Sequence, residues 1–174
     1  MTQLADHDWF PRTERLIWQY YAAMDRMDRL QAQIGAVEDR LAQISMDIAG
    51  ARSIRSITQA LSFAPAGARG DPGIDAELEH MEERVTALLE EYTRKRRYVL
   101  EKRARLAALR EENAVIDAAM QRLTRDEREV AKLRYRRPGM NNCEIAVALY
   151  CSEGWVRLTR KRLVRKVAEA IGIL

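Results

Sequence analysis

The chain has 174 residues, of which 47% are hydrophobic and 32% are charged, and its net charge is +4. This composition excludes a wholly disordered chain, because enough apolar surface is available for burial. No run of about 20 apolar residues is present that could cross a membrane. The positive balance lies at the C-terminal end, since residues 124–174 carry 12 basic and 6 acidic side chains. A basic end after nearly neutral segments is typical of nucleic-acid binding.

The low content of glycine and proline, 8 and 4 residues, indicates long uninterrupted helices. Between residues 11 and 49, apolar residues recur at spacings of three and four, the heptad pattern of a coiled-coil helix. Pro11 and Thr13 suit the start of this helix, and Gly50 suits its end. We therefore predict an N-terminal tail over residues 1–12, followed by a first long helix.

A second apolar series runs from Ile74 to Leu123 with the same alternation. A helix over residues 74–118 would be about 65–70 Å long, more than a single globular core covers. We predict an all-α protein that begins with a long antiparallel coiled-coil hairpin over residues 13–120, in which Leu41 faces Met81. Two helices bury little surface. We therefore expect either a homodimer through the coiled coil or another part of the chain that packs on the two helices.

The connection over residues 50–73 has two halves. Residues 53–63 place apolar side chains at roughly helical spacing, which predicts a short separate helix. The other half, APAGARGDPG, is rich in glycine and proline, so we expect a mobile loop that proteases cut first.

The sequence has no pattern that would support catalysis or metal binding. Its only cysteines and histidines are Cys143, Cys151, His7 and His80, too few and too scattered for a zinc site. It has no phosphate-binding glycine loop and no nucleophile with a supporting base. We expect no enzyme activity, no cofactor and no metal. The acidic N-terminus lacks the features of a secretory signal, and we expect reduced thiols in a cytoplasmic protein.

After residue 123 the heptad pattern stops and short helices are predicted. Two capping boxes, Thr124 with Glu127 and Asn141 with Glu144, mark two helix starts, because each pair of side chains accepts free backbone N–H groups. Pro138-Gly139 separates these helices, and a third helix follows. The three helices predict a compact helix-turn-helix domain over residues 121–174.

The last two helices have the pattern of a helix-turn-helix. Ala146 is the small residue at the crossing, and Ser152 is a good N-cap for the second helix. The first turn of that helix would contact base edges in the major groove, and its later cations would contact phosphates. The predicted DNA-binding residues are Ser152, Glu153, Gly154, Trp155, Arg157, Leu158, Arg160, Lys161, Arg162 and Arg165.

The second helix has a predicted inward stripe, formed by Val156, Leu163 and Val167. This stripe leaves most of the cations to solvent or phosphate. Arg157 is the predicted base or phosphate contact. Trp155 has two interpretations: it packs on the preceding helix, or it lies against a deoxyribose or a thymine methyl group of bound DNA.

Two stretches, LTRDEREVAKLRY at residues 123–135 and EIAVALYCSEGWVRLTRKRLVRKV at residues 144–167, resemble region 4 of the sigma-70 family. The resemblance covers about a quarter of the chain and implies a helix-turn-helix that binds promoter DNA at the −35 element. The arrangement of long heptad helices followed by a single region-4-like module resembles that of small phage-encoded, sigma-like regulators of late genes, the ArpU/RinA type. The resemblance implies double-stranded DNA and bacterial RNA polymerase as partners.

Two features depart from the region 4 pattern. Tyr150 stands where the family has its corner glycine, so a positive φ at this residue would carry strain of about 1–2 kcal/mol. Of the family's base-contacting positions, only Arg157 is kept. The other positions hold Glu153, Gly154, Trp155 and Leu158. A consensus −35 element is therefore not the expected target.

These patterns together predict a sequence-specific DNA-binding transcription regulator of phage or prophage genes, either an activator or a partial sigma-like factor. Two alternatives share the pattern. A small terminase-like DNA-packaging subunit also combines a helix-turn-helix with coiled-coil helices, and it would form a large ring. A coiled-coil adaptor would instead bind RNA polymerase through the basic helix without touching DNA.

Overall fold

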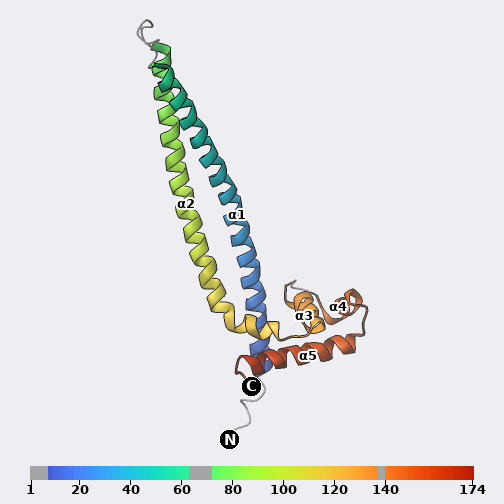
Figure 1. Cartoon of the computed structure of the whole chain (residues 1–174). Helices are drawn as coiled ribbons and strands as arrows, with labels where there is room; N and C mark the ends of the chain where they lie inside the picture. The colour runs from blue at the N-terminus through green and yellow to red at the C-terminus, as the bar shows by residue number, and fades with distance from the viewer. Residues whose placement is uncertain (1–7, 63–71, 137–139) are drawn as a thin grey trace. The chain divides into compact units, whose positions relative to one another are not determined.

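The structure, a computed structural model, describes residues 8–62, 72–136 and 140–174. Within them the protein is all-helical, as predicted (Figure 1). The helices are α1 (Trp9–Ser62), α2 (Pro72–Gln121), α3 (Arg125–Ala131), α4 (Asn142–Ala148) and α5 (Glu153–Ala170), with a π-helical segment at Lys132–Arg136 after α3. The chain divides into two compact units. One comprises Met1–Arg29 with Leu106–Leu174, and the other comprises Leu30–Arg105.

The helix α1 begins four residues before the predicted start at Thr13. The Thr13 side chain is fully buried, and its hydroxyl donates a hydrogen bond to the Trp9 carbonyl one turn earlier, at 2.7 Å. Trp9 and Phe10 pack against the main apolar cluster of their unit. These contacts extend the helix into the segment that the sequence assigned to the N-terminal tail.

The prediction that α1 ends at Gly50 is wrong, because the helix continues to Ser62. A glycine inside a helix costs only about 1 kcal/mol relative to alanine. Contacts on both sides of Gly50 offset that cost: Ile48 is buried, and Arg55 forms an ion pair with Glu82 at 2.9 Å. The short helix predicted over residues 53–63 is therefore the end of α1. The predicted loop falls largely on residues 63–71, outside the described residues, and Pro72 already belongs to α2.

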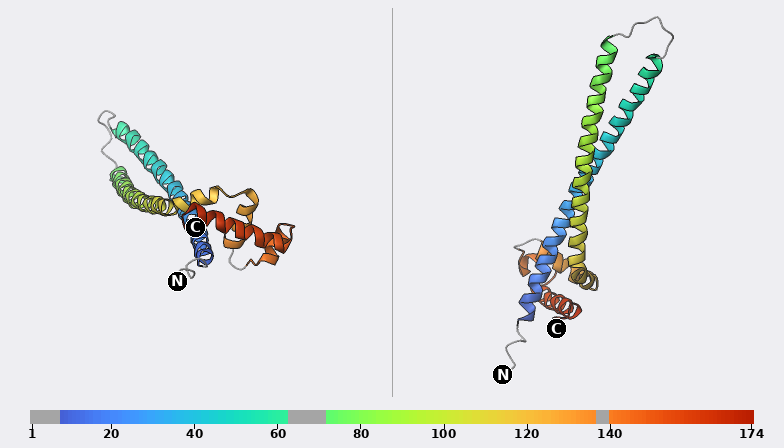
Figure 2. Two further views of the ribbon diagram at one scale, coloured as in Figure 1. Left: turned by 90° about the horizontal axis from the view of Figure 1, so that it is seen from below. Right: turned by 90° about the vertical axis from the view of Figure 1, so that its left-hand side faces the viewer.

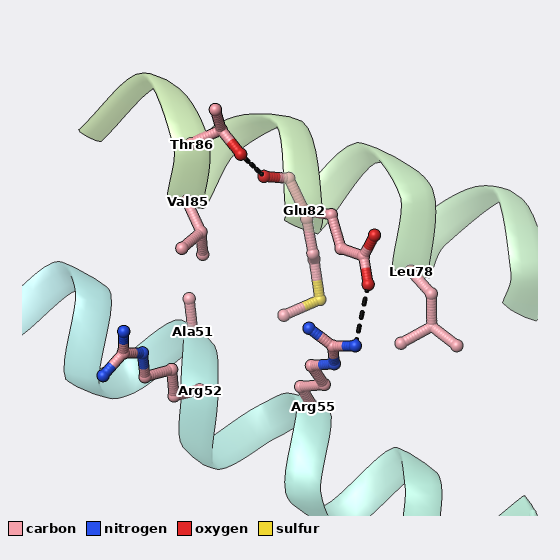
Figure 3. Close-up of a pocket in the computed structure, with 8 residues that line it drawn as sticks. Ala51, Arg52, Arg55, Leu78, Glu82, Val85 and Thr86 are labelled. Carbon is pink, nitrogen blue, oxygen red and sulfur yellow. Dashed lines mark hydrogen bonds and ion pairs between the residues drawn. The ribbon is translucent and has the colours of Figure 1, made fainter. Parts of the chain in front are cut away.

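Within the unit Leu30–Arg105, α1 and α2 run in opposite directions (Figure 2). The predicted register, with Leu41 facing Met81, is wrong. Met81 instead lines a hollow together with Ala51 and Arg55, where Arg55 points toward Glu82 (Figure 3). The cause is the length of α1, because the added turns after Gly50 shift each α1 residue toward a later residue of α2.

The seam of this unit is thin. Among the side chains of this unit that the structure describes, the buried apolar ones are Leu30, Ile34, Ile44 and Ile48 from α1 and Val99 from α2. Exposed ion pairs flank the seam: Arg40 Nε lies 3.3 Å from Glu91 Oε1, and Arg103 pairs with Glu38. The apolar contact and the ion pairs together hold the two helices at this register.

The other unit has one continuous apolar core. Residues from α1 (Ile17, Tyr20, Tyr21) and α2 (Ala119, Met120) join residues of α3, α4 and α5 in it. Tyr20 also donates a hydrogen bond to Asp117 at 2.6 Å. The unit is thus larger than the predicted domain over residues 121–174. The reason is that α3 and α4 have only seven residues each, so they offer few inward apolar positions.

Candidate nucleic-acid interface

Both predicted capping boxes are confirmed. The backbone N–H of Glu127 donates to Thr124 Oγ1 at 3.3 Å, and that of Thr124 donates to Glu127 Oε2 at 2.8 Å. At the start of α4, the N–H of Glu144 donates to Asn141 Oδ1 at 2.9 Å, and that of Asn141 donates to Glu144 Oε2 at 2.7 Å. These local bonds fix where α3 and α4 begin, before any long-range contact is made.

The turn between α4 and α5 is sharp. Ile145 is fully buried and Ala146 is 7% exposed, and the Ala146 carbonyl accepts the N–H of Cys151 at 3.0 Å. Tyr150 has a φ of 53°, so the condition for strain at this corner is met, and the strain is about 1–2 kcal/mol. The Tyr150 side chain is 98% exposed and packs on nothing that would offset this strain. Ser152 caps α5, since its Oγ accepts the N–H of Trp155 at 3.2 Å.

One face of α5 is buried in the apolar core of its unit. The predicted inward stripe of Val156, Leu163 and Val167 is confirmed, with all three side chains fully buried. The buried arc is wider than predicted, because it also includes Thr159, Val164 and Ala168. The short spacings of the predicted stripe did not include these three positions.

The opposite face of α5 carries the exposed cations. Arg157 forms an ion pair with Glu153 at 2.7 Å, and Arg165 forms one with Glu169 at 2.9 Å, both one turn apart on the helix. Lys161 and Arg162 are exposed, and no ion pair with them is found in the described part of the chain. The structure thus brings four of the predicted DNA-binding cations onto one solvent-facing surface: Arg157, Lys161, Arg162 and Arg165.

The prediction that Arg160 faces solvent or phosphate is wrong. Its Nε lies 2.7 Å from Glu14 Oε1 and its Nη2 lies 2.8 Å from Glu14 Oε2, a bidentate pair with α1. The guanidinium also stacks over the Phe10 ring at 5.7 Å from the centroid. The Arg160 side chain is only 23% exposed. Its guanidinium is therefore committed to the fold, and we remove it from the candidate interface.

Tyr135 completes this cluster by donating its hydroxyl to Glu14 Oε1 at 2.5 Å. Burial raises the pKa of Tyr135, and the hydrogen bond to Glu14 raises it further, so the phenol stays protonated. Burial alone would lower the pKa of Arg160, but the hydrogen bonds and charge of Glu14 outweigh burial and raise it. Sequence inspection missed Glu14, because 146 positions separate it from Arg160 and no local pattern links them.

Lys166 is also engaged within the fold. Its Nζ lies 2.7 Å from Glu127 Oε1, and the Glu127 side chain is 6% exposed. Burial alone would raise the pKa of the Glu127 carboxyl, but its hydrogen bonds with Lys166 and with the Thr124 backbone hold that pKa below the usual value. The capping box of α3 thus also ties α3 to α5.

The exposed face of α5 also carries apolar surface at its first two turns. Trp155 is 36% exposed and Leu158 is 49% exposed, so neither is enclosed by the fold. Gly154 lies on the same exposed face, and a side-chain carbon added there would meet nothing within 4 Å. Glu153 is held by Arg157, and the Ser152 side chain is occupied with its cap. Glu153, Gly154 and Arg157, the first-turn residues that the sequence assigned to base edges, thus lie beside this apolar surface.

No group of three or more His, Cys, Asp or Glu side chains that could hold a metal is found in residues 8–62, 72–136 and 140–174. Cys143 and Cys151 are free thiols. None of the described helices is both long enough and apolar enough to span a membrane.

Comparisons of the chain with models of protein families, with curated proteins and with solved structures find no match. The resemblance to sigma region 4 therefore stays a prediction from the sequence.

Proposed function

We propose that α4 and α5 form a helix-turn-helix with which this protein binds double-stranded DNA as a sequence-specific transcription regulator. The observation that carries the proposal is the division of α5 into a fully buried apolar face and an exposed face with Lys161 and Arg162 unpaired among the described residues. Unpaired exposed cations opposite a rigid buried stripe suit a phosphate backbone, because they can bind it without reorganising the fold.

The local geometry supports the same proposal. The chain turns sharply at Tyr150, and Ser152 caps the start of α5 directly after this turn. In helix-turn-helix proteins the N-terminal turns of the second helix contact base edges while the rest of that helix contacts the backbone. Arg157 is released for DNA only when its exposed pair with Glu153 opens, and exposed pairs of this type contribute little stability.

The proposed role for the two-helix unit follows from its thin seam. We assign α1 and α2 over Leu30–Arg105 to an antiparallel coiled-coil arm that contacts bacterial RNA polymerase or a second copy of the chain. The protein would act in the cytoplasm on phage or prophage promoters, as the resemblance to sigma-like regulators implies. We propose that it acts there as an activator or partial sigma-like factor.

The test begins with selection of bound duplexes from a random DNA library by the full chain. A selected duplex is then titrated at several salt concentrations with the wild-type protein and with a Lys161→Ala/Arg162→Ala double variant. Each neutralised phosphate contributes about 0.9 to the log–log salt slope, so the double variant should lower the slope by up to about 1.8. Arg96→Ala/Arg97→Ala, a matched change on the exposed face of α2, should leave the slope unchanged.

Two results would overturn the proposal. One is the absence of any DNA binding at about 50 mM salt, where phosphate contacts are strongest. The other is an equal effect of the α5 and α2 double variants. A large ring in light scattering, together with DNA binding, would favour a packaging subunit over a regulator. The roles of individual cations follow from the same assay: Arg157→Ala should relax sequence preference, whereas Arg165→Ala should weaken all sequences alike.

A further inference from the structure

The exposed face of α5 is not purely cationic where it would meet DNA. Leu158 is 49% exposed, and Trp155, three residues earlier, is 36% exposed. Residues three or four apart lie on the same side of a helix, so these two side chains are neighbours on the surface. An apolar strip therefore occupies the first two turns of α5.

Gly154 lies on the same side of α5 as this strip, because it is four residues before Leu158. The fold itself does not require glycine at this position: a side-chain carbon there would meet no atom within 4 Å, and the backbone is in an ordinary helical conformation. Glycine lowers helix stability by up to about 1 kcal/mol relative to alanine. Glycine at this position thus leaves space for a partner that approaches the first turn of α5 closely.

The charges around the strip indicate what that partner is. Lys161 and Arg162 follow Leu158 by three and four residues, so they flank it on the next turn. A surface that combines small apolar contacts with unpaired cations fits the DNA major groove, where thymine presents a C5-methyl group between two phosphate backbones. Guanine, by contrast, is recognised by bidentate Arg or Lys. Because Arg157 is the only cation in the first two turns of α5, this surface is better suited to thymine than to guanine.

We propose that Gly154, Trp155 and Leu158 form a specificity surface that reads thymine methyl groups in the major groove. Gly154 lets the base edge approach, and Leu158 and Trp155 bury the methyl group. This inference rests on the proposed DNA-binding function. It identifies the recognised sequence class as A·T pairs with their methyl groups facing the start of α5.

The experiment replaces thymine by uracil in the selected duplex, one position at a time, which removes only the methyl group. Burial of one CH₂-sized group contributes about 0.8 kcal/mol, so the wild-type protein should lose about fourfold in affinity at each methyl that it contacts. Leu158→Ala should bind the thymine duplex more weakly and should no longer distinguish uracil from thymine at one of these positions. Val147→Ala, an exposed apolar change on α4, is the matched control and should keep the discrimination.

Gly154→Ala provides a second and independent readout. The variant should be at least as stable as the wild type in thermal unfolding, because alanine favours the helix. It should nevertheless bind the thymine duplex more weakly, since its methyl group occupies the space of the approaching base edge. Weaker binding without lost stability separates a contact role from a structural one.

The outcomes separate this inference from the proposed function. Salt-dependent binding that needs Lys161 and Arg162 but ignores uracil at every position would overturn the methyl-reading inference and leave the DNA-binding function intact. Tight binding by Gly154→Ala would count against the inference in the same way. The absence of DNA binding, with Leu158→Ala instead abolishing binding to purified RNA polymerase, would overturn both and make the strip a protein-docking surface.

Discussion

The ion pairs Glu14–Arg160 and Glu38–Arg103, one from each compact unit, lie in different environments. In the unit that contains α3, α4 and α5, the side chains of Glu14 and Arg160 are 17% and 23% exposed and sit beside a continuous apolar core. In the unit Leu30–Arg105, the side chains of Glu38 and Arg103 are 40% and 60% exposed and flank a thin seam. The same chemical pairing is thus enclosed by protein in one unit and mostly surrounded by water in the other.

This difference teaches where a charge is free to bind a partner. A partly buried pair resists rearrangement, because breaking it leaves a charge poorly solvated. An exposed pair exchanges readily with water or with a phosphate. Arg160 and Lys166 are therefore structural, whereas Arg157 and Arg165 keep their charge available on the surface.

The largest expected effect comes from the apolar core beside these pairs. Leu163→Ala removes a fully buried side chain and should lower the free energy of unfolding by about 2–5 kcal/mol. Trp9, Trp18 and Trp155 all lie in this unit, so tryptophan fluorescence during urea unfolding reports on it selectively. Leu158→Ala, the same change on the exposed face, should shift stability by less than about 0.5 kcal/mol. Equal losses for the two variants would contradict the assignment of the α5 faces.

A smaller effect is expected at the enclosed ion pair. Glu14→Gln keeps the shape of the side chain but removes the charge that Arg160 and Tyr135 share, and it should destabilise the unit by about 1.5–3 kcal/mol. Glu169→Gln removes the partner of the exposed Arg165 and should change stability by less than about 1 kcal/mol. The two variants are compared by urea unfolding at neutral pH. A larger loss of stability for Glu169→Gln than for Glu14→Gln would contradict the distinction between enclosed and exposed pairs.

The pH dependence of the same unit should come in part from Glu127. Because the pKa of Glu127 is lowered in the folded protein, its contribution to stability is complete above the unfolded value of about 4.3 and is lost as the pH falls through the lower folded value. Glu127→Gln should therefore reduce the slope of stability against pH in this acidic range. Fluorescence-detected unfolding between about pH 3 and pH 6 measures that slope. An unchanged slope, with Glu129→Gln as the exposed control, would contradict the assignment.

The smallest effect is expected in the two-helix unit. Arg103→Ala breaks an exposed pair with Glu38 and should lower stability by less than about 1 kcal/mol, with the difference reduced further at high salt. Far-UV circular dichroism follows this unfolding, because all three tryptophans lie outside the unit. A salt-insensitive loss above about 2 kcal/mol would show that the pair is enclosed, for instance by a second copy of the chain.

Local sequence patterns predicted the features that depend on neighbours in the chain. The capping boxes at Thr124 and Asn141, the cap at Ser152 and the buried stripe of α5 all followed from short spacings. Each of these features is stabilised by interactions within about one or two helical turns, so the residues that form it are visible together in the sequence.

The tertiary structure decided the features that join distant segments. The register of α1 against α2 depended on how far α1 continues past Gly50, and neighbouring contacts outweighed the weak helix-breaking effect of one glycine. Arg160 carries the same local pattern as Arg157 and Arg162, yet Glu14 enclosed it because α1 packs against α5. A charged side chain's sequence position sets its helix face, but only the packing of other elements decides whether that face meets solvent.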